Sequence, residues 1–79
     1  MLDHKLTIFY QTAKHLNTTK AAEILRLSQP AISKSIKELE RGLGITLFDR
    51  EKGRLTLTPA GKYLLEQSED LIERERMIT

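Results

Sequence analysis

Polar and basic side chains gather on one face of a helix predicted to begin after Ser28. Within SQPAISKSIKELERGL, the apolar residues Ile32, Ile36, Leu39 and Leu43 recur at helical spacing, which is typical of a helix packed against a core. The opposite face carries Gln29, Ser33, Lys34, Lys37 and Arg41. Glutamine pairs with adenine through two hydrogen bonds, serine binds either base edge, and lysine binds guanine or phosphate. The face therefore suits the major groove of DNA.

A merely solvated helix face would carry similar residue types. This one follows a tight break at Arg26-Leu27-Ser28, begins with Ser28 as the expected cap residue, and is succeeded by a basic hairpin. These features favour contact with DNA over simple solvation. The acidic residues Glu38 and Glu40 are expected to lie away from the groove, with Glu38 paired to Lys34 four positions earlier.

Two further helices precede this one. Leu2 to Leu16 is predicted as a helix, and Asn17 is the expected N-cap of the next, whose packing face consists of Ala21, Ala22, Ile24 and Leu25. The start of that second helix, Thr18, Thr19 and Lys20, suits a phosphate, although capping alone would explain it. Pro30 fits the first turn of the third helix, and Gly44 is predicted to end that helix in a left-handed conformation, with Ile45 folded back on Leu39.

After Gly44 the apolar pattern changes to period 2. Two runs, Ile45 to Asp49 and Arg54 to Thr58, predict a β-hairpin with a hydrophilic tip at residues 49–53. Arg50, Lys52 and Arg54 make this tip basic. It is expected to reach the DNA backbone or the adjacent minor groove, the alternative being that these charges only keep an edge hairpin soluble.

Thr58-Pro59 predicts the start of a last helix that runs to about Ile78 and is roughly 30 Å long. Its apolar positions continue beyond the length of helix that the small preceding domain can cover. Pairing of this helix with a second copy is therefore expected, rather than a disordered tail. The predicted dimer contacts are Leu64, Leu65, Ser68, Leu71, Ile72 and Ile78.

Composition supports a polyanion partner. Residues 1–65 hold 11 Lys and Arg against 6 Asp and Glu, whereas residues 66–79 hold 2 against 5. The chain has no cysteine, no membrane-spanning apolar run and no signal-peptide pattern, so a cytoplasmic location is expected. His4 and His15 lie about 16 Å apart on one helix, too far to share a metal. We expect no catalytic residue, metal or cofactor.

Together these elements predict a mainly α fold with a small β-hairpin: a winged helix-turn-helix over residues 1–58, followed by a long C-terminal linker and dimerisation helix over 59–79. The predicted core is Phe9, Ala22, Leu25, Ile32, Ile36, Leu39, Leu47, Phe48 and Leu57. The rival interpretation keeps this fold but makes it a protein-docking module without DNA contact. A third, the DNA-recognition portion of a recombinase or other enzyme, would need catalytic residues that are not in this chain.

The segment AAEILRLSQPAISKSIKELERGLGITLFDR, followed by LTLTPAG, resembles the N-terminal DNA-binding domain of LysR-type transcriptional regulators. The resemblance implies a bacterial regulator that binds an imperfect palindromic operator in double-stranded DNA as a homodimer, through paired linker helices. It implies base contacts for Gln29, Pro30, Ser33 and Lys34. It implies phosphate or minor-groove contacts for Thr19, Ser28, Arg50 and the hairpin tip, to which the residues themselves add Thr18, Lys20 and Lys37.

Two positions depart from the family pattern. The family often has an apolar residue where this chain has Thr18, and the wing arginine common in the family falls at Gly53, leaving Lys52 or Arg54 as substitutes. Family members continue into a domain that binds a small-molecule effector. The chain is therefore expected to be an excised DNA-binding fragment, with a natural short relative as the alternative.

Overall fold

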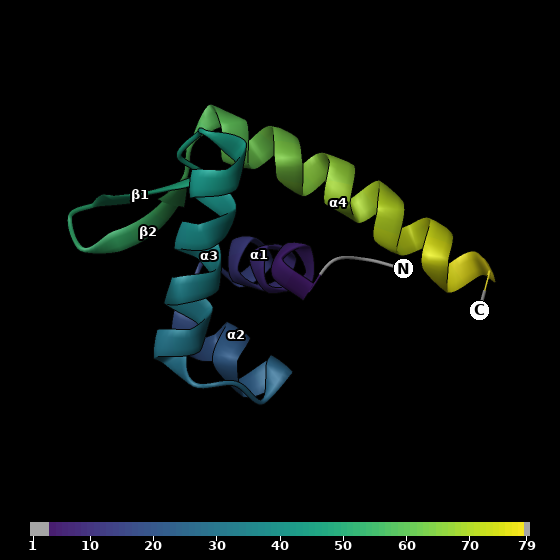
Figure 1. The fold of residues 1–79 in the computed structure, drawn as a ribbon, viewed down its shortest axis with the longest axis horizontal. Coiled ribbons are helices and arrows are strands. Elements are labelled where there is room, and N and C mark those ends of the chain that lie inside the picture. Colours follow the sequence, from purple (N-terminus) through teal and green to yellow (C-terminus); the bar gives the residue numbers. More distant parts are fainter. Residues whose placement is uncertain (1–3, 79) are drawn as a thin grey trace.

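The computed structural model describes residues 4–78, and the side chains of residues 4–74. Three helices come first: α1 (His4–His15), α2 (Thr18–Leu25) and α3 (Gln29–Leu43). A hairpin of β1 (Phe48–Glu51) and β2 (Arg54–Leu57) follows, and α4 (Pro59–Ile78) comes last. In Figure 1 the hairpin and α4 leave one end of α3 toward opposite sides, with α1 behind the middle of α3 and α2 beside its other end. This is the predicted mainly α, winged helix-turn-helix architecture.

The helix boundaries have local causes. The Asn17 side chain accepts a hydrogen bond from the Lys20 amide at 3.0 Å, and Ser28 Oγ accepts from the Ala31 amide at 3.2 Å, so both predicted N-caps are confirmed. Arg26 adopts a left-handed conformation with φ 57° and ends α2. Gly44, with φ 70°, ends α3 as predicted. Pro30 lies in the first turn of α3, where no intrahelical amide bond is lost.

Two apolar clusters form the interior. The first joins the three N-terminal helices through the buried residues Ile8, Ala21, Ala22, Ile32 and Ile36. The second joins α1 to the hairpin and α4 through Phe9, Ala13 and Leu47. Phe48 packs against both clusters, and its ring lies 5.5 Å from that of Phe9 between centroids. All the predicted core residues lie within or against these clusters.

The apolar stripe of α3 is shorter than predicted. Leu43 is 49% exposed and Ile45 is 43% exposed. The Ile45 amide does donate to the Glu40 carbonyl oxygen at 3.2 Å, the six-residue bond of a Schellman ending. Burial therefore stops near Leu39, because the chain turns toward the hairpin directly after Gly44.

The hairpin differs from its predicted boundaries. Asp49 to Glu51 belong to β1 and pair antiparallel with Arg54 to Thr56, so only Lys52 and Gly53 form the turn. Both have positive φ, 52° and 77°, as a two-residue type I′ turn requires. The predicted five-residue tip is therefore wrong. A two-stranded ribbon exposes polar residues within its strands, so polarity alone does not distinguish such a strand from a loop.

Candidate nucleic-acid interface

The first turn of α3 presents its polar residues to solvent. Gln29, Pro30, Ser33 and Lys34 are all exposed, whereas Ile32 and Ile36 of the same helix are buried. The face predicted from residue spacing is therefore open on the folded molecule. Its position follows from the Ser28 cap and from the two isoleucines, which together set how α3 is rotated against α1 and α2.

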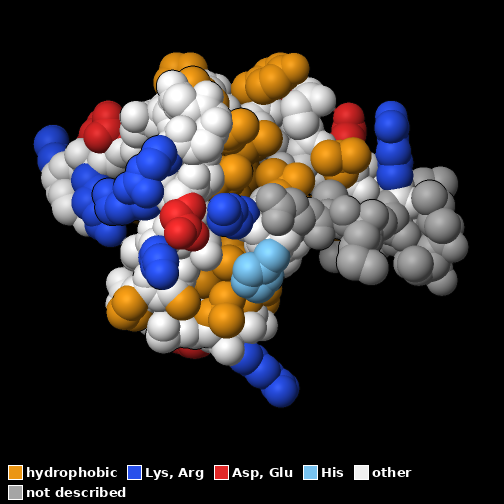
Figure 2. Space-filling model, in the orientation of Figure 1, with side chains coloured by type: hydrophobic (Ala, Val, Ile, Leu, Met, Phe, Trp, Pro, Cys, Tyr) orange, Lys and Arg blue, Asp and Glu red, His pale blue; other side chains and the backbone are white. Residues whose placement is uncertain are grey.

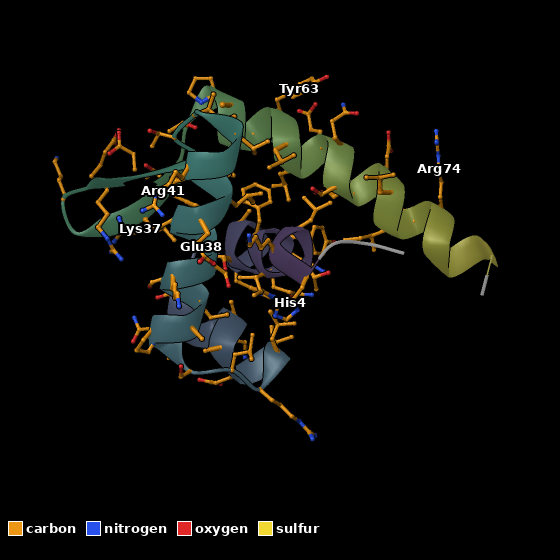
Figure 3. All side chains as sticks on the ribbon, viewed as in Figure 1. His4, Lys37, Glu38, Arg41, Tyr63 and Arg74 are labelled. Atoms are coloured by element: carbon orange, nitrogen blue, oxygen red, sulfur yellow. The ribbon has the colours of Figure 1, made fainter. Side chains whose placement is uncertain are left out.

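Cations surround this face. Lys34, Lys37 and Arg41 are exposed along α3, and the hairpin adds the exposed side chains of Arg50, Lys52 and Arg54. In Figure 2 Lys and Arg side chains gather over α3 and the hairpin, and Figure 3 shows Lys37 and Arg41 on the hairpin side of α3. One side of the molecule thus carries the positive charge needed to meet a polyanion.

A groove of about 350 Å³ separates α3 from the hairpin. Its lining includes Ser33, Ile36 and Lys37 from α3 with Phe48, Arg50 and Leu55 from the hairpin. A second, more polar hollow of about 230 Å³ lies beside it, lined by residues that include Asn17, Thr18 and Gln29. Thr18, Arg50 and Leu55 line both hollows, so the hairpin and the start of α2 meet between them.

The start of α2 meets the start of α3. Thr19 and Lys20 are exposed, whereas Thr18 is half-buried. Gln29 Nε2 donates a hydrogen bond to Thr18 Oγ1 at 2.9 Å. Helical periodicity does not predict this contact, because the two residues are 11 positions apart and belong to different helices.

The two acidic residues of α3 have different surroundings. Glu40 is turned toward the protein, where its Oε2 accepts hydrogen bonds from the Leu47 amide at 2.7 Å and the Phe48 amide at 3.3 Å. It thereby holds the entry to the hairpin, and it lines the groove between α3 and the hairpin together with Lys37 and Arg50. Glu38 is half-buried and follows Lys37 in the middle of α3 (Figure 3).

The predicted dimer residues of α4 do not share one environment. Leu64 and Leu65 are half-buried against the second apolar cluster of their own chain. Ser68 is completely buried, and its Oγ donates to the Leu64 carbonyl oxygen at 2.8 Å. Ser68 therefore has no surface to offer a second copy, and its prediction as a dimer contact is wrong. Leu71 is 45% exposed and Ile72 half-buried, while the Ile78 side chain lies outside the described residues.

Among the described residues, no group of His, Cys, Asp and Glu side chains is arranged to hold a metal ion. No helix in the described part of the chain is long and apolar enough to cross a membrane.

Comparison with known proteins adds to this geometry. Residues 4–62 match the model of the bacterial regulatory helix-turn-helix proteins of the lysR family. The chain is 48% identical over 62 residues to the HTH-type transcriptional regulator YcgK of Bacillus subtilis, covering 78% of this chain and 19% of that protein. It is 44% identical over 68 residues to the HTH-type transcriptional regulator CfxR of Cupriavidus necator, covering 86% and 22%. The chain thus spans about a fifth of the length of these curated relatives.

Solved structures of similar fold include complexes with DNA. The DNA-binding domain of CbnR, solved with DNA, superposes with a TM-score of 0.84 at 32% identity, covering 98% of this chain and 88% of that one. The DNA-binding domain of BenM, solved with a catB site, gives 0.89 at 29% identity, covering 99% and 87%. A LysR-family regulator from Eggerthella lenta gives 0.79 at 40% identity, covering 85% and 96%.

Proposed function

The chain belongs to the lysR family of bacterial regulatory helix-turn-helix proteins, and on that premise we propose how it recognises DNA as a transcriptional regulator. Residues 1–58 form the DNA-binding unit. The start of α3 enters the major groove, where Gln29, Pro30, Ser33 and Lys34 approach base edges. The observation that supports this most directly is the exposure of these four residues on a capped helix whose other side is buried.

The flanking contacts go to phosphates and the neighbouring minor groove. They are assigned to Thr18, Thr19, Lys20, Ser28, Lys37, Arg50, Lys52 and Arg54. Hydroxyls and amides at the start of α2 and cations on the hairpin are the groups that bind phosphate oxygens, and they position the protein without reading sequence.

A second copy completes the unit. We assign residues 59–79 to a linker helix that pairs two copies, with Leu71 and Ile72 as the described residues that still offer apolar surface. Leu64 and Leu65 support the helix from their own core. A twofold dimer places two α3 helices on an imperfect palindrome, with half-sites about one helical turn or a multiple apart. A small-molecule effector would act on a separate effector domain of the full-length regulator, which would work in the cytoplasm.

Selection of bound sequences from a random duplex library, followed by salt-titrated binding to the selected site, tests this proposal. The logarithm of the affinity should fall linearly with the logarithm of salt concentration, with a slope of about −0.9 for each neutralised phosphate. The rival docking module predicts no binding to any duplex, even at low salt.

Single substitutions separate the two kinds of contact. Ser33→Ala should relax preference at one base pair by roughly 1–3 kcal/mol, whereas Lys52→Ala should weaken binding to all sequences alike and reduce the salt slope by about 1. Arg74→Ala is the control, because Arg74 is a cation on the part of α4 remote from α3 and the hairpin (Figure 3). Unchanged sequence preference in Ser33→Ala would remove Ser33 from the base-contacting set.

A further inference from the structure

The hydrogen bond between Thr18 and Gln29 joins a half-buried residue to an exposed one. Thr18 is the first residue of α2, Gln29 is the first residue of α3, and the bond from Gln29 Nε2 to Thr18 Oγ1 is 2.9 Å long. Both side chains line the polar hollow beside Arg50. The bond therefore spans the two elements of the helix-turn-helix, at the edge of the face proposed to meet the bases.

The bond limits what Gln29 can present. A glutamine amide has one carbonyl oxygen, which accepts, and one NH₂ group with two N–H donors. Thr18 Oγ1 takes one N–H. When the N–H trans to the carbonyl oxygen is the one that bonds Thr18, the carbonyl oxygen and the second N–H remain side by side, as an acceptor next to a donor. Adenine exposes the complementary pair in the major groove, a donor at N6 and an acceptor at N7.

Restraint of the side chain also has an energetic effect. A free glutamine at a helix start samples many rotamers, and ordering it on DNA costs conformational entropy. A side chain already held by Thr18 has less freedom to lose, so it binds a matching base more tightly and adapts less readily to a wrong one. Thr18 itself is ordered by its half-buried position at the start of α2.

We propose that Thr18 is a positioning residue that sets sequence preference, by holding the Gln29 amide in the orientation that selects adenine. This inference rests on the proposed function, because it requires Gln29 to face a base pair. It goes beyond that function because Thr18 then contributes to sequence specificity and does not only contact the DNA backbone.

The opposite orientation of the amide makes a different prediction. If the Thr18 hydroxyl donated to the Gln29 carbonyl oxygen, the NH₂ group would face the base. Two donors would then favour guanine, whose N7 and O6 both accept. Selection of guanine at the base pair that loses discrimination in Gln29→Ala would overturn the proposal.

The experiment compares wild type, Thr18→Val and Thr18→Ser in competitive binding to duplexes that differ only at this base pair. Valine keeps the shape of threonine and removes the hydroxyl, whereas serine keeps the hydroxyl. Thr18→Val should lower the preference for adenine about twofold to tenfold, the worth of one neutral hydrogen bond. Thr18→Ser should retain it. Equal preference in wild type and Thr18→Val would overturn the inference.

A double-mutant cycle separates positioning from a general effect on folding or on phosphate binding. In a Gln29→Ala background, Thr18→Val should cause no further change in preference at this base pair. An equal loss in both backgrounds would mean that Thr18 acts independently of Gln29 and would overturn the proposal.

Hydrogen exchange of the Gln29 side-chain amide, measured without DNA, separates failure of the proposed function from failure of the role of Thr18. The Gln29 side-chain NH₂ signals, assigned by their disappearance in Gln29→Ala, should exchange more slowly with water in wild type and Thr18→Ser than when the hydroxyl is absent. If wild type binds no duplex at low salt, the proposed function fails and the inference falls with it. If wild type binds selectively but Gln29 exchanges equally fast in all three proteins, only the role of Thr18 fails.

Discussion

At the residue scale, one glycine allows the hairpin and α4 to approach each other closely. Gly61, in the first turn of α4, is buried against the backbone that leads into β1. A Cβ atom built at this position would collide with the Leu47 carbonyl oxygen and lie 2.9 Å from Leu57 Cδ2. The same carbonyl oxygen accepts a hydrogen bond from the Thr58 amide, so it is not free to move aside. Glycine is therefore required here by a close approach between two segments.

Gly61→Ala should destabilise the fold by about 1–3 kcal/mol, because the added methyl group meets backbone rather than a flexible side chain. Urea unfolding monitored by circular dichroism measures the change. Gly42→Ala is the matched control: Gly42 is helical, nothing lies within 4 Å of its Cβ position, and alanine there should stabilise by up to about 1 kcal/mol. Similar free energies of unfolding for the two variants would contradict this account.

At the scale of elements, the β1–β2 hairpin, which is the wing of the winged helix-turn-helix, is attached to the rest of the protein by hydrogen bonds as well as by apolar contacts. The carboxylate of Glu40, in α3, accepts hydrogen bonds from the Leu47 and Phe48 amides. At the base of the hairpin, the Thr58 amide donates to the Leu47 carbonyl oxygen and Thr58 Oγ1 donates to the Thr46 carbonyl oxygen at 2.6 Å. The hairpin itself has only two short strands, which are marginally stable alone. Its direction relative to α3 therefore depends on these anchors at its base.

Glu40→Ala should leave the Leu47 and Phe48 amides without their partner, at a cost of about 1–3 kcal/mol. Hydrogen exchange at these two amides should accelerate more than exchange within α1. Glu23→Ala serves as the control, because Glu23 is an exposed acidic residue on α2. Unchanged protection of the Phe48 amide in Glu40→Ala would show that apolar packing alone holds the wing.

The whole molecule separates its charges between its two ends. Residues 1–65 carry the cationic excess and residues 66–79 the acidic one. Figure 1 shows α4 extending away from the helix-turn-helix, and Leu71 in its far half is 45% exposed. Apolar residues on such an extension are expected to be covered by another copy.

Leu71→Glu should weaken self-association by at least about tenfold, because a buried carboxylate without a partner is costly at an interface. Sedimentation equilibrium measures this. The thermal stability of the isolated protomer should change little, since Leu71 is already 45% exposed. Tyr63→Glu is the control, as Tyr63 is 65% exposed and lies about 130° around the helix from the midpoint between Leu71 and Ile72. Equal weakening by both variants would place the contact elsewhere on α4.

Local signals in the sequence determined much of this protein. The caps at Asn17 and Ser28, the left-handed Gly44 and the Thr58-Pro59 start are short-range features, so the sequence alone located the starts of α2, α3 and α4 and the end of α3. The exposed face of α3 was predictable in part, because a helix that buries Ile32 and Ile36 must turn Lys34 and Lys37 outward. Gln29 lies only about 20° around the helix from Ile36, so its exposure at the helix start was decided by the tertiary structure.

What only the tertiary structure decided are the contacts between segments far apart in the chain. The Thr18–Gln29 bond, the Glu40 anchor of the wing and the close approach at Gly61 each depend on how helices and hairpin are placed against one another. The burial of Ser68 belongs with them, since helical spacing shows which residues share a face but not which part of that face the protein's own core covers. The apolar periodicity of a sequence reflects the geometry within one helix or strand. It carries no information on where a neighbouring element lies.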